Sequence, residues 1–250
     1  MSEQRVKSGI PGMDEMLGGG FIPESAILLR GAPGTGKTTF GLQYLLEGVR
    51  RGETGMFISF EEFPQSLYRD AESLGWNLPE IEQAGKLRIM FTSPKVLQQS
   101  LATPESNLLR TIHDLDIRRV VVDSLTHFTQ QITDEHELRQ VYHQVTSAFR
   151  REGVTAIYLG EEMRSDYTAH ERGRLSFVVD NMIMLRYLEV DSAIERAIVV
   201  LKMRSSAHDT AIRSYEIGAN GITIGNPLEG KTGLLSGLTQ RSLISTVREQ

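Results

Sequence analysis

Gly31-Ala-Pro-Gly-Thr-Gly-Lys37-Thr38 stands between an apolar run, 26–30, and a segment with apolar residues at helical spacing, 38–51. The stretch fits the pattern G-x-x-x-x-G-K-[ST], in which glycines let backbone N–H groups turn inward, the lysine reaches phosphates, and the hydroxyl ligates Mg²⁺. We therefore expect a phosphate-binding loop for a Mg²⁺-nucleotide. The residues expected to contact the nucleotide are Gly31, Ala32, Pro33, Gly34, Thr35, Gly36, Lys37, Thr38 and Thr39.

Other uses of a glycine-rich turn fit this stretch less well. A dinucleotide-binding fingerprint, G-x-G-x-x-G, would require a third glycine at the position of Thr39. A glycine turn with an incidental lysine would need neither a strand before it nor a helix after it. The sequence therefore favours a P-loop.

Apolar runs like the one before the loop recur along the chain and alternate with helix-like segments. They lie at 25–30, 54–60, 87–92, 119–122 and 154–159. This alternation predicts an α/β domain with a mostly parallel central sheet and crossover helices. The clearest helices are expected at 38–51 and 135–151, and each ends near a glycine that would stop it.

The pattern changes after residue 177, where strand-like segments follow one another without obvious helices. These segments lie at 178–188, 196–203, 213–217 and 221–224. They predict antiparallel strands that extend the sheet at its edge. We place the α/β domain at 1–226 and expect 227–250 to be a docking tail or a short helix that packs on the domain.

Composition limits the classes of function. The chain carries 27 Lys and Arg against 32 Asp and Glu, a net charge of -5, which gives no global positive field for holding a polyanion. The absence of cysteine excludes disulfides, thiolate metal sites and a cysteine nucleophile. Neither a signal-like N-terminus nor an apolar stretch of about 20 residues occurs, so we expect a cytoplasmic protein without membrane contact.

A P-loop needs a second carboxylate to hold Mg²⁺. The run Arg119-Val-Val-Val-Asp123 ends a predicted strand on an aspartate. Ligands of open α/β sheets bind at the carboxyl ends of the strands, so we expect Asp123 at the edge that carries the P-loop. We predict that Thr38 and Asp123 hold the metal; an aspartate at a strand end is otherwise an ordinary turn residue.

Two further carboxylates, Glu61 and Glu62, directly follow the predicted strand at 54–60. Hydrolysis requires a base that positions or deprotonates the attacking water, and a strand end beside the phosphates could provide it. Successive residues diverge as they leave a strand, so one of the two is expected to point at the γ-phosphate. The spacing equally allows both residues to cap the next helix, 63–75.

Four further motifs accompany the P-loop. They are Ser8-Gly-Ile-Pro-Gly-Met-Asp14-Glu-Met-Leu-Gly-Gly-Gly20, Ser59-Phe-Glu61-Glu62, Val122-Asp123-Ser124-Leu125 and Val200-Leu-Lys202-Met-Arg204-Ser-Ser-Ala-His208-Asp209. In this order, from about residue 6 to residue 224, the chain resembles the KaiC family of RecA-like ATPases. The resemblance implies a homo-oligomeric ring, usually a hexamer, that binds ATP and Mg²⁺ between adjacent subunits.

The resemblance also implies roles for single residues. Glu61 and Glu62 correspond to the family's catalytic glutamate pair. Lys202 and Arg204 correspond to a K-x-R element that reaches the γ-phosphate of the neighbouring subunit. Alternate residues of a strand share one face, so this element could present two cations together. Without the resemblance, the two cations would be interpreted as a solvated strand face.

Three more positions depend on the resemblance alone. His208 and Asp209 are expected near the same interface and in contact with the nucleotide. Some two-domain relatives phosphorylate an adjacent Ser-Thr pair; here Ser176 matches one acceptor and Phe177 replaces the other. Autophosphorylation of Ser176 is therefore a hypothesis, and a buried strand serine is the alternative.

Three classes of function remain open. The first is a slow, ring-forming ATPase whose nucleotide state controls a protein partner. The second is a DNA-binding motor or a recombination and repair ATPase, although the loops expected to face the ring's centre, 126–135 and 160–174, lack the cationic, aromatic character that single strands prefer. Nucleic-acid binding is thus not the favoured interpretation. The third is a nucleotide-dependent scaffold that hardly turns over.

Overall fold

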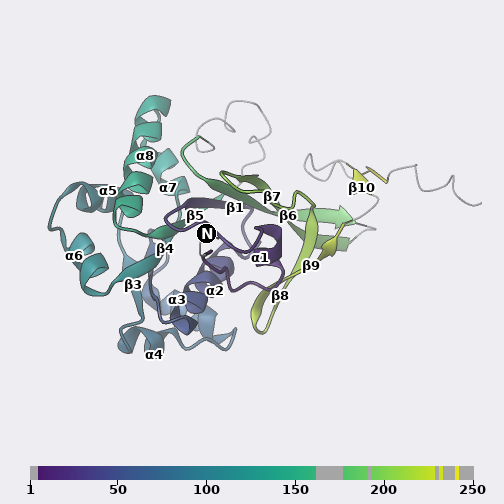
Figure 1. Cartoon of the computed structure of the whole chain (residues 1–250), viewed down its shortest axis with the longest axis horizontal. Coiled ribbons are helices and arrows are strands. Elements are labelled where there is room, and N and C mark those ends of the chain that lie inside the picture. The colour runs from purple at the N-terminus through teal and green to yellow at the C-terminus, as the bar shows by residue number, and fades with distance from the viewer. Residues whose placement is uncertain (1–4, 162–176, 191–192, 229–230, 233–239, 242–250) are drawn as a thin grey trace, which may run out of the picture.

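The computed structural model describes residues 5–161, 177–190, 193–228, 231–232 and 240–241. Within them, a nine-stranded sheet of order β3-β2-β4-β5-β1-β6-β7-β8-β9 forms the centre (Figure 1). Its strands are β1 (Ala26–Gly31), β2 (Thr54–Ser59), β3 (Leu87–Phe91), β4 (Ile117–Asp123), β5 (Thr155–Glu161), β6 (Asn181–Val190), β7 (Ala193–Met203), β8 (Arg213–Gly218) and β9 (Gly221–Pro227). The helices are α1 (Met13–Met16), α2 (Lys37–Arg50), α3 (Pro64–Glu72), α4 (Leu78–Gln83), α5 (Pro94–Ala102), α6 (Asn107–Asp114), α7 (Thr126–Gln131) and α8 (Glu135–Arg151).

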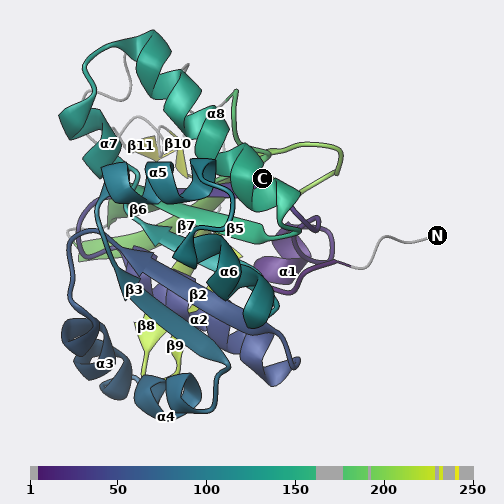
Figure 2. The ribbon, with the colours of Figure 1, turned by 90° about the vertical axis from the view of Figure 1, so that its left-hand side faces the viewer.

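The first six strands of the sheet order, from β3 to β6, run parallel to one another. Helices cover both faces of this parallel part (Figure 2). Strands buried on both faces read as continuous apolar runs, which is why β1, β2, β4 and β5 were evident from the sequence. The predicted mostly parallel α/β sheet is confirmed.

The C-terminal part of the sheet differs from the prediction in one respect. The strand β6 pairs with β1 in parallel, with Ile27 opposite Asn181, so it continues the parallel sheet. Within this sheet, the antiparallel pairs of the described residues are β6 with β7, β7 with β8 and β8 with β9. The apolar pattern of β6 reflects the burial of residues such as Ile183 and Leu185 in the core. The pattern would be the same for a parallel and for an antiparallel neighbour, so it does not reveal the direction of pairing.

Two helices cover the centre of the sheet from opposite sides. The buried apolar side chains of α2 belong to one cluster, and those of α8 belong to the other. A Cβ atom on Gly41 of α2 would lie 2.8 Å from the side chain of Val121 in β4. This close approach holds the N-terminal end of α2 directly over the strand that carries Asp123.

The carboxyl ends of the parallel strands meet at one edge of the sheet. Register places Gly31 beside Glu161 and Ser59 beside Asp123. The P-loop, the glutamate pair and Asp123 therefore leave the sheet at the same edge, as predicted from the order of strands and motifs. The fold thus gathers the candidate residues in one place.

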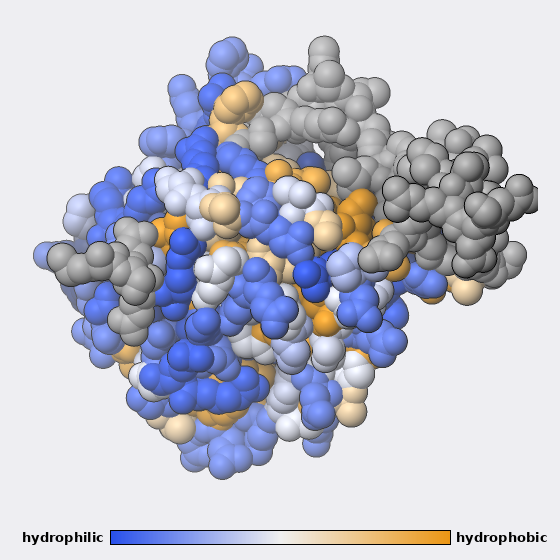
Figure 3. All heavy atoms as spheres, turned by 45° about the vertical axis from the view of Figure 1, so that its right-hand side comes forward, coloured by the Kyte–Doolittle hydropathy of each residue, from blue (hydrophilic) through white to orange (hydrophobic). Residues whose placement is uncertain are grey.

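Hydrophilic residues predominate on the face drawn in Figure 3, and hydrophobic residues form smaller patches on it. Among the residues described, no helix is long and apolar enough to cross a membrane. In the predicted tail, β10 (Lys231–Thr232) pairs with β11 (Gln240–Arg241); most of the tail lies outside the described residues.

Candidate functional site

The P-loop connects β1 to α2, as the sequence predicts. The ammonium group of Lys37 donates hydrogen bonds to the carbonyls of Gly31, at 2.9 Å, and Ala32, at 3.2 Å. The hydroxyl of Thr35 donates to the carbonyl of Ala32 at 2.7 Å and closes the loop on itself. The loop is therefore a compact turn with its lysine folded over the mouth.

Two glycines give the loop its shape. Gly34 and Gly36 have φ values of 78° and 89°, in the left-handed region that glycine alone adopts without strain. A Cβ atom on Gly36 would also lie 2.6 Å from the side chain of Ile217. The first turn of α2, where Thr38 and Thr39 lie, adds N–H groups that have no partner within the helix. Such a turn followed by a helix N-terminus suits a phosphate group.

Thr38 and Asp123 are brought together at this edge. The Thr38 hydroxyl donates a hydrogen bond to a carboxylate oxygen of Asp123 at 3.1 Å. Burial raises the pKa of Asp123, and the Thr38 hydrogen bond and the charge of Lys37 oppose the shift. A hydroxyl and a buried carboxylate are the oxygen ligands that Mg²⁺ takes beside a nucleotide, so the donor set fits the predicted metal.

Three carboxylates lie close enough to Lys37 for their charges to act on it. Burial lowers the pKa of Lys37, while the negative charges of Glu161, Asp123 and Glu61 oppose the shift. The carboxylate of Glu161 comes from the end of β5, and no signal in the sequence singled it out. Three carboxylates against one ammonium group leave an excess of negative charge at this edge, although the described residues contain no group of three or more Asp, Glu or His side chains placed to hold a metal.

Glu61 and Glu62 diverge after β2, as expected of consecutive residues. The backbone amides of both donate to the Ser59 hydroxyl, at 3.4 Å and 2.9 Å. The side chain of Glu61 is exposed and lies 3.8 Å from the Nε2 atom of His127. The alternative in which the pair caps α3 is not realised, because the N-cap of α3 is Phe63 and no acidic residue lies in its first turn.

Glu62 has a different environment from Glu61. It is half-buried, and its Oε2 atom has no hydrogen-bond partner among the described residues. Burial raises the pKa of Glu62, and the negative charge of Asp123 adds to the shift. The charge of Glu61, by contrast, acts on Lys37.

His127 is a further residue of this edge that sequence reasoning missed. It lies in α7, and its Nδ1 atom is 3.3 Å from the Ser124 hydroxyl. Its ring also packs edge-on against Phe60, with centroids 6.0 Å apart. A histidine four residues after the strand-end Asp123 was the only available signal. His127 thus lies between β4, the strand that ends at Asp123, and Glu61.

Lys202 and Arg204 lie far from the P-loop of their own chain. The ammonium group of Lys202 donates to the Val179 carbonyl at 2.7 Å, and a guanidinium N–H of Arg204 donates to the Phe177 carbonyl at 2.7 Å. Burial lowers the pKa of Lys202, and the positive charge of Arg204 adds to the shift, so the two cations lie close together.

The register of the sheet sets the distance of Lys202 and Arg204 from the P-loop of the same chain. The Arg204 amide donates to the Asp180 carbonyl, and the Asp180 amide donates to the carbonyl of Ala26, at the start of β1. The P-loop begins at Gly31, five residues later along β1, which corresponds to about 16 Å at ~3.3 Å per residue. The K-x-R element therefore lies at the opposite end of β1 from its own P-loop.

His208 and Asp209 are held by contacts within the chain. The carboxylate of Asp209 accepts hydrogen bonds from the Ala211 amide, at 2.8 Å, and from the Arg213 guanidinium, at 2.7 and 3.1 Å. These bonds lower the pKa of Asp209. The His208 Nε2 atom is buried without a partner among the described residues. Ser176 and most of the loop expected at 160–174 lie outside the described residues.

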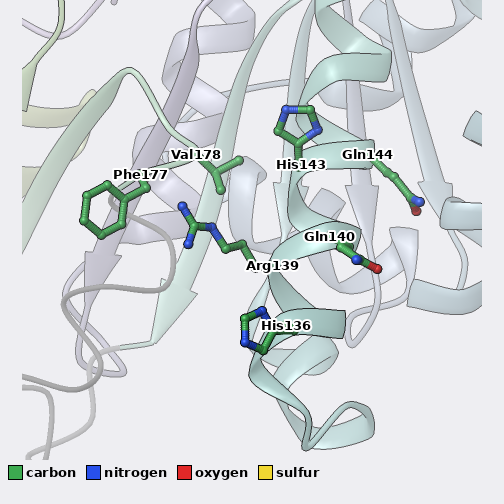
Figure 4. A pocket seen from close by; sticks show the side chains of 7 residues that line it. All are labelled: His136, Arg139, Gln140, His143, Gln144, Phe177 and Val178. Carbon is green, nitrogen blue, oxygen red and sulfur yellow. The ribbon is translucent and has the colours of Figure 1, made fainter.

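A hollow along α8 is separate from this site. It is lined by His136, Arg139, Gln140, His143, Gln144, Phe177 and Val178. In Figure 4 the side chain of Arg139 extends toward Phe177, and its guanidinium carbon lies 5.4 Å from the centroid of that ring. The hollow borders Arg204 through the Phe177 carbonyl, but it contains none of the P-loop residues.

The chain is similar to known proteins of one family. A family model described as the ATPase KaiC matches residues 6–229. The circadian clock oscillator protein KaiC of Rippkaea orientalis is 33% identical over 252 residues, which cover 99% of this chain and 47% of that protein. The chain spans about half the length of the curated KaiC proteins that it matches.

Other relatives match over most of both chains. The UPF0273 protein of Thermotoga maritima is 32% identical over 248 residues, covering 92% of this chain and 99% of that protein. The crystal structure of a KaiC-like protein from Pyrococcus horikoshii OT3 superposes with a TM-score of 0.78 at 31% identity, covering 89% of this chain and 99% of that one. The chain belongs to the KaiC family of ATPases, and it is similar to the single-domain, KaiC-like members of that family.

Proposed function

We propose that this chain binds Mg-ATP at the edge formed by β1, β2, β4 and β5 and hydrolyses it slowly within a homo-oligomeric ring. The observation that carries the proposal is the hydrogen bond between Thr38 and Asp123, directly beside Lys37. It joins the two predicted metal ligands across the sheet at the mouth of the P-loop. A hydroxyl, a carboxylate and a lysine in this arrangement serve nucleotide binding in P-loop proteins.

Each residue of the edge has a proposed role. Inward-facing amides of the P-loop and the ammonium group of Lys37 would hold the phosphates, and Thr38 and Asp123 would hold Mg²⁺. The bound metal would supply positive charge that neutralises phosphate oxygens. Glu61, whose side chain is exposed and whose charge acts on Lys37, would accept a proton from the attacking water, and Glu62 would support its position.

The active site is completed by a second copy of the chain. The proposal assigns Lys202 and Arg204 to the nucleotide of the neighbouring subunit, because in their own subunit they lie at the opposite end of β1. A cation supplied in trans stabilises charge in the transition state. Each contact in such a ring joins two different surfaces of the subunit, so the interface is heterologous. The expected ring size, a hexamer, rests on the family resemblance.

Mixing two inactive variants tests this arrangement. Lys37→Ala removes the P-loop lysine, and Arg204→Ala removes the trans cation. If the ring forms as proposed, half of the subunits in an equal mixture keep an intact P-loop and half of their neighbours supply Arg204, so about a quarter of wild-type phosphate release is restored.

The outcome is measured after co-refolding or subunit exchange, with light scattering to confirm the assembly in Mg-ATP. Each variant alone should remain inactive at every concentration. A mixture with no more activity than the separate variants, in an assembly shown to contain both, would contradict the trans arrangement. So would wild-type activity that stays constant down to a demonstrated monomer.

The output of the ring is also part of the proposal. We expect the nucleotide state to control binding of a protein partner, since the relatives at this level of similarity include circadian clock oscillator proteins. Autophosphorylation of Ser176 is a further proposal that rests on the family resemblance. Mass spectrometry of the peptide that contains Ser176 after incubation with Mg-ATP tests it, and absence of phosphate from that peptide would refute it.

A further inference from the structure

Three side chains form a row beside the P-loop, one from each of three neighbouring strands. Tyr187 of β6 and Arg196 of β7 are register partners, and the guanidinium carbon of Arg196 lies 5.7 Å from the centroid of the Tyr187 ring. The strands β7 and β8 are antiparallel and Ala197 pairs with Ser214, so the next residue of β8, Tyr215, lies beside Arg196. None of these residues belongs to the motifs that identify the family.

The tyrosine hydroxyls at the two ends of the row reach the P-loop. The hydroxyl of Tyr215 donates a hydrogen bond to the carbonyl of Thr35 at 2.6 Å, and both residues are buried. The hydroxyl of Tyr187 lies beside Gly34, where a Cβ atom would be only 2.8 Å from it. Two consecutive residues of the loop are thus backed by tyrosines from the antiparallel end of the sheet.

The Tyr215 hydrogen bond fixes the orientation of one peptide group. The peptide between Thr35 and Gly36 is planar and trans, so its C=O and N–H groups point in opposite directions. When the carbonyl is held by Tyr215 on the core side, the N–H of Gly36 must face the other way, toward the mouth of the loop. This is the direction in which a P-loop presents its amides to phosphates.

We propose that Tyr215 is a positioning residue for nucleotide binding, which holds the Thr35 carbonyl so that the Gly36 amide is aimed at the phosphates before the nucleotide arrives. This inference rests on the proposed function and adds a residue to it. Without the hydroxyl, the Thr35 carbonyl loses its buried partner, and the loop is free to turn that peptide away. The binding-competent shape then forms only part of the time, and affinity falls by the same fraction.

The test compares Tyr215→Phe with Tyr44→Phe. Tyr44 is a matched control because its hydroxyl also donates to a buried backbone carbonyl, that of Thr155, at 3.0 Å. That bond lies at the start of β5, at the opposite edge of the sheet from the P-loop. Both substitutions keep the aromatic ring, so both variants should fold and lose a similar amount of stability in urea.

Binding and turnover separate the two variants. By titration calorimetry, Tyr215→Phe should bind Mg-ATP about 5- to 30-fold more weakly than wild type, and Tyr44→Phe should match wild type within about twofold. In phosphate release, the KM of Tyr215→Phe should rise with kcat unchanged, because its chemical groups remain in place. Hydrogen exchange of the peptide covering 31–38 should become faster in Tyr215→Phe alone.

Equal affinity and equal loop exchange in Tyr215→Phe and Tyr44→Phe would show that the hydrogen bond is only structural and would overturn this inference. In that case the wild-type chain would still bind Mg-ATP, so the proposed function would stand. A well-folded wild-type chain that binds no Mg-ATP would overturn both. The two failures are therefore distinguishable in one set of titrations.

Discussion

Replacing Glu61 by Gln should stop hydrolysis while nucleotide binding is kept. Glu61 is the carboxylate whose charge acts on both Lys37 and Asp123, and its side chain is exposed to incoming water. A positioned general base contributes about 100- to 10,000-fold to a rate, or roughly 3 to 5 kcal/mol of transition-state stabilisation. We expect phosphate release by Glu61→Gln to fall by at least about 100-fold.

Glu62→Gln is the matched comparison, because it makes the same chemical change at the next residue. Glu62 is half-buried and is influenced by Asp70 and Arg69 of α3 as well as by Asp123. We expect its loss to reduce turnover by about tenfold or less, through a shift in the position of Glu61.

The assay is single-turnover phosphate release with Mg-ATP, with binding measured separately by calorimetry. Glu61→Gln should bind Mg-ATP as tightly as wild type, because the P-loop and the metal ligands are unchanged. Turnover of Glu61→Gln within a few fold of wild type would refute the assignment of the base. If the double variant of Glu61 and Glu62 also released phosphate at the wild-type rate, neither side chain would take part in the chemistry.

Two predictions concern stability. Arg119 is buried in β4, forms an ion pair with Glu53 and donates a hydrogen bond to the carbonyl of Tyr44 at 3.0 Å. Arg119→Ala should therefore lower the free energy of unfolding, measured in urea, by about 3 to 5 kcal/mol. A loss below about 1 kcal/mol would contradict this prediction. The pKa of Glu62 is higher in the folded chain than in the unfolded chain, because burial disfavours the charged carboxylate. The folded chain therefore loses stability as the pH rises from the ordinary glutamate pKa to the raised pKa of the folded state. Glu62→Gln should therefore be at least as stable as wild type at pH 7, and the gap should close in acid; a less stable variant at pH 7 would show that the carboxylate has a partner in solution.

The residues whose positions in the fold could be predicted from the sequence are those with short-range signals. The P-loop needs specific residues at fixed spacing, and Asp123 ends an apolar run, so both could be located before the fold was known. Their meeting at one edge follows from the parallel arrangement of β1 and β4. Glu61 and Glu62 were located in the same way, but the difference between them depends on burial, which the sequence does not display.

Contacts between distant segments could not be predicted. The hydrogen bond from Tyr215 to Thr35 joins residues 180 positions apart, and a tyrosine in an antiparallel strand carries no sign of its partner. The parallel pairing of β6 with β1 was missed for a similar reason, since apolar periodicity reports burial and not the direction of the neighbouring strand. Arg119 reads as the polar start of a strand, yet it is buried, because Glu53 and backbone carbonyls compensate its charge.

Every role proposed for this chain depends on Mg²⁺-dependent nucleotide binding by the P-loop. Titration calorimetry of the folded chain with ATP, with and without Mg²⁺, measures it directly, and Lys37→Ala provides the comparison. We predict saturable binding by wild type that weakens when Mg²⁺ is removed and a loss of at least about tenfold in affinity in Lys37→Ala, because the ammonium group lies at the mouth of the loop. Binding that is absent in wild type, indifferent to Mg²⁺, or unchanged in Lys37→Ala would contradict the account.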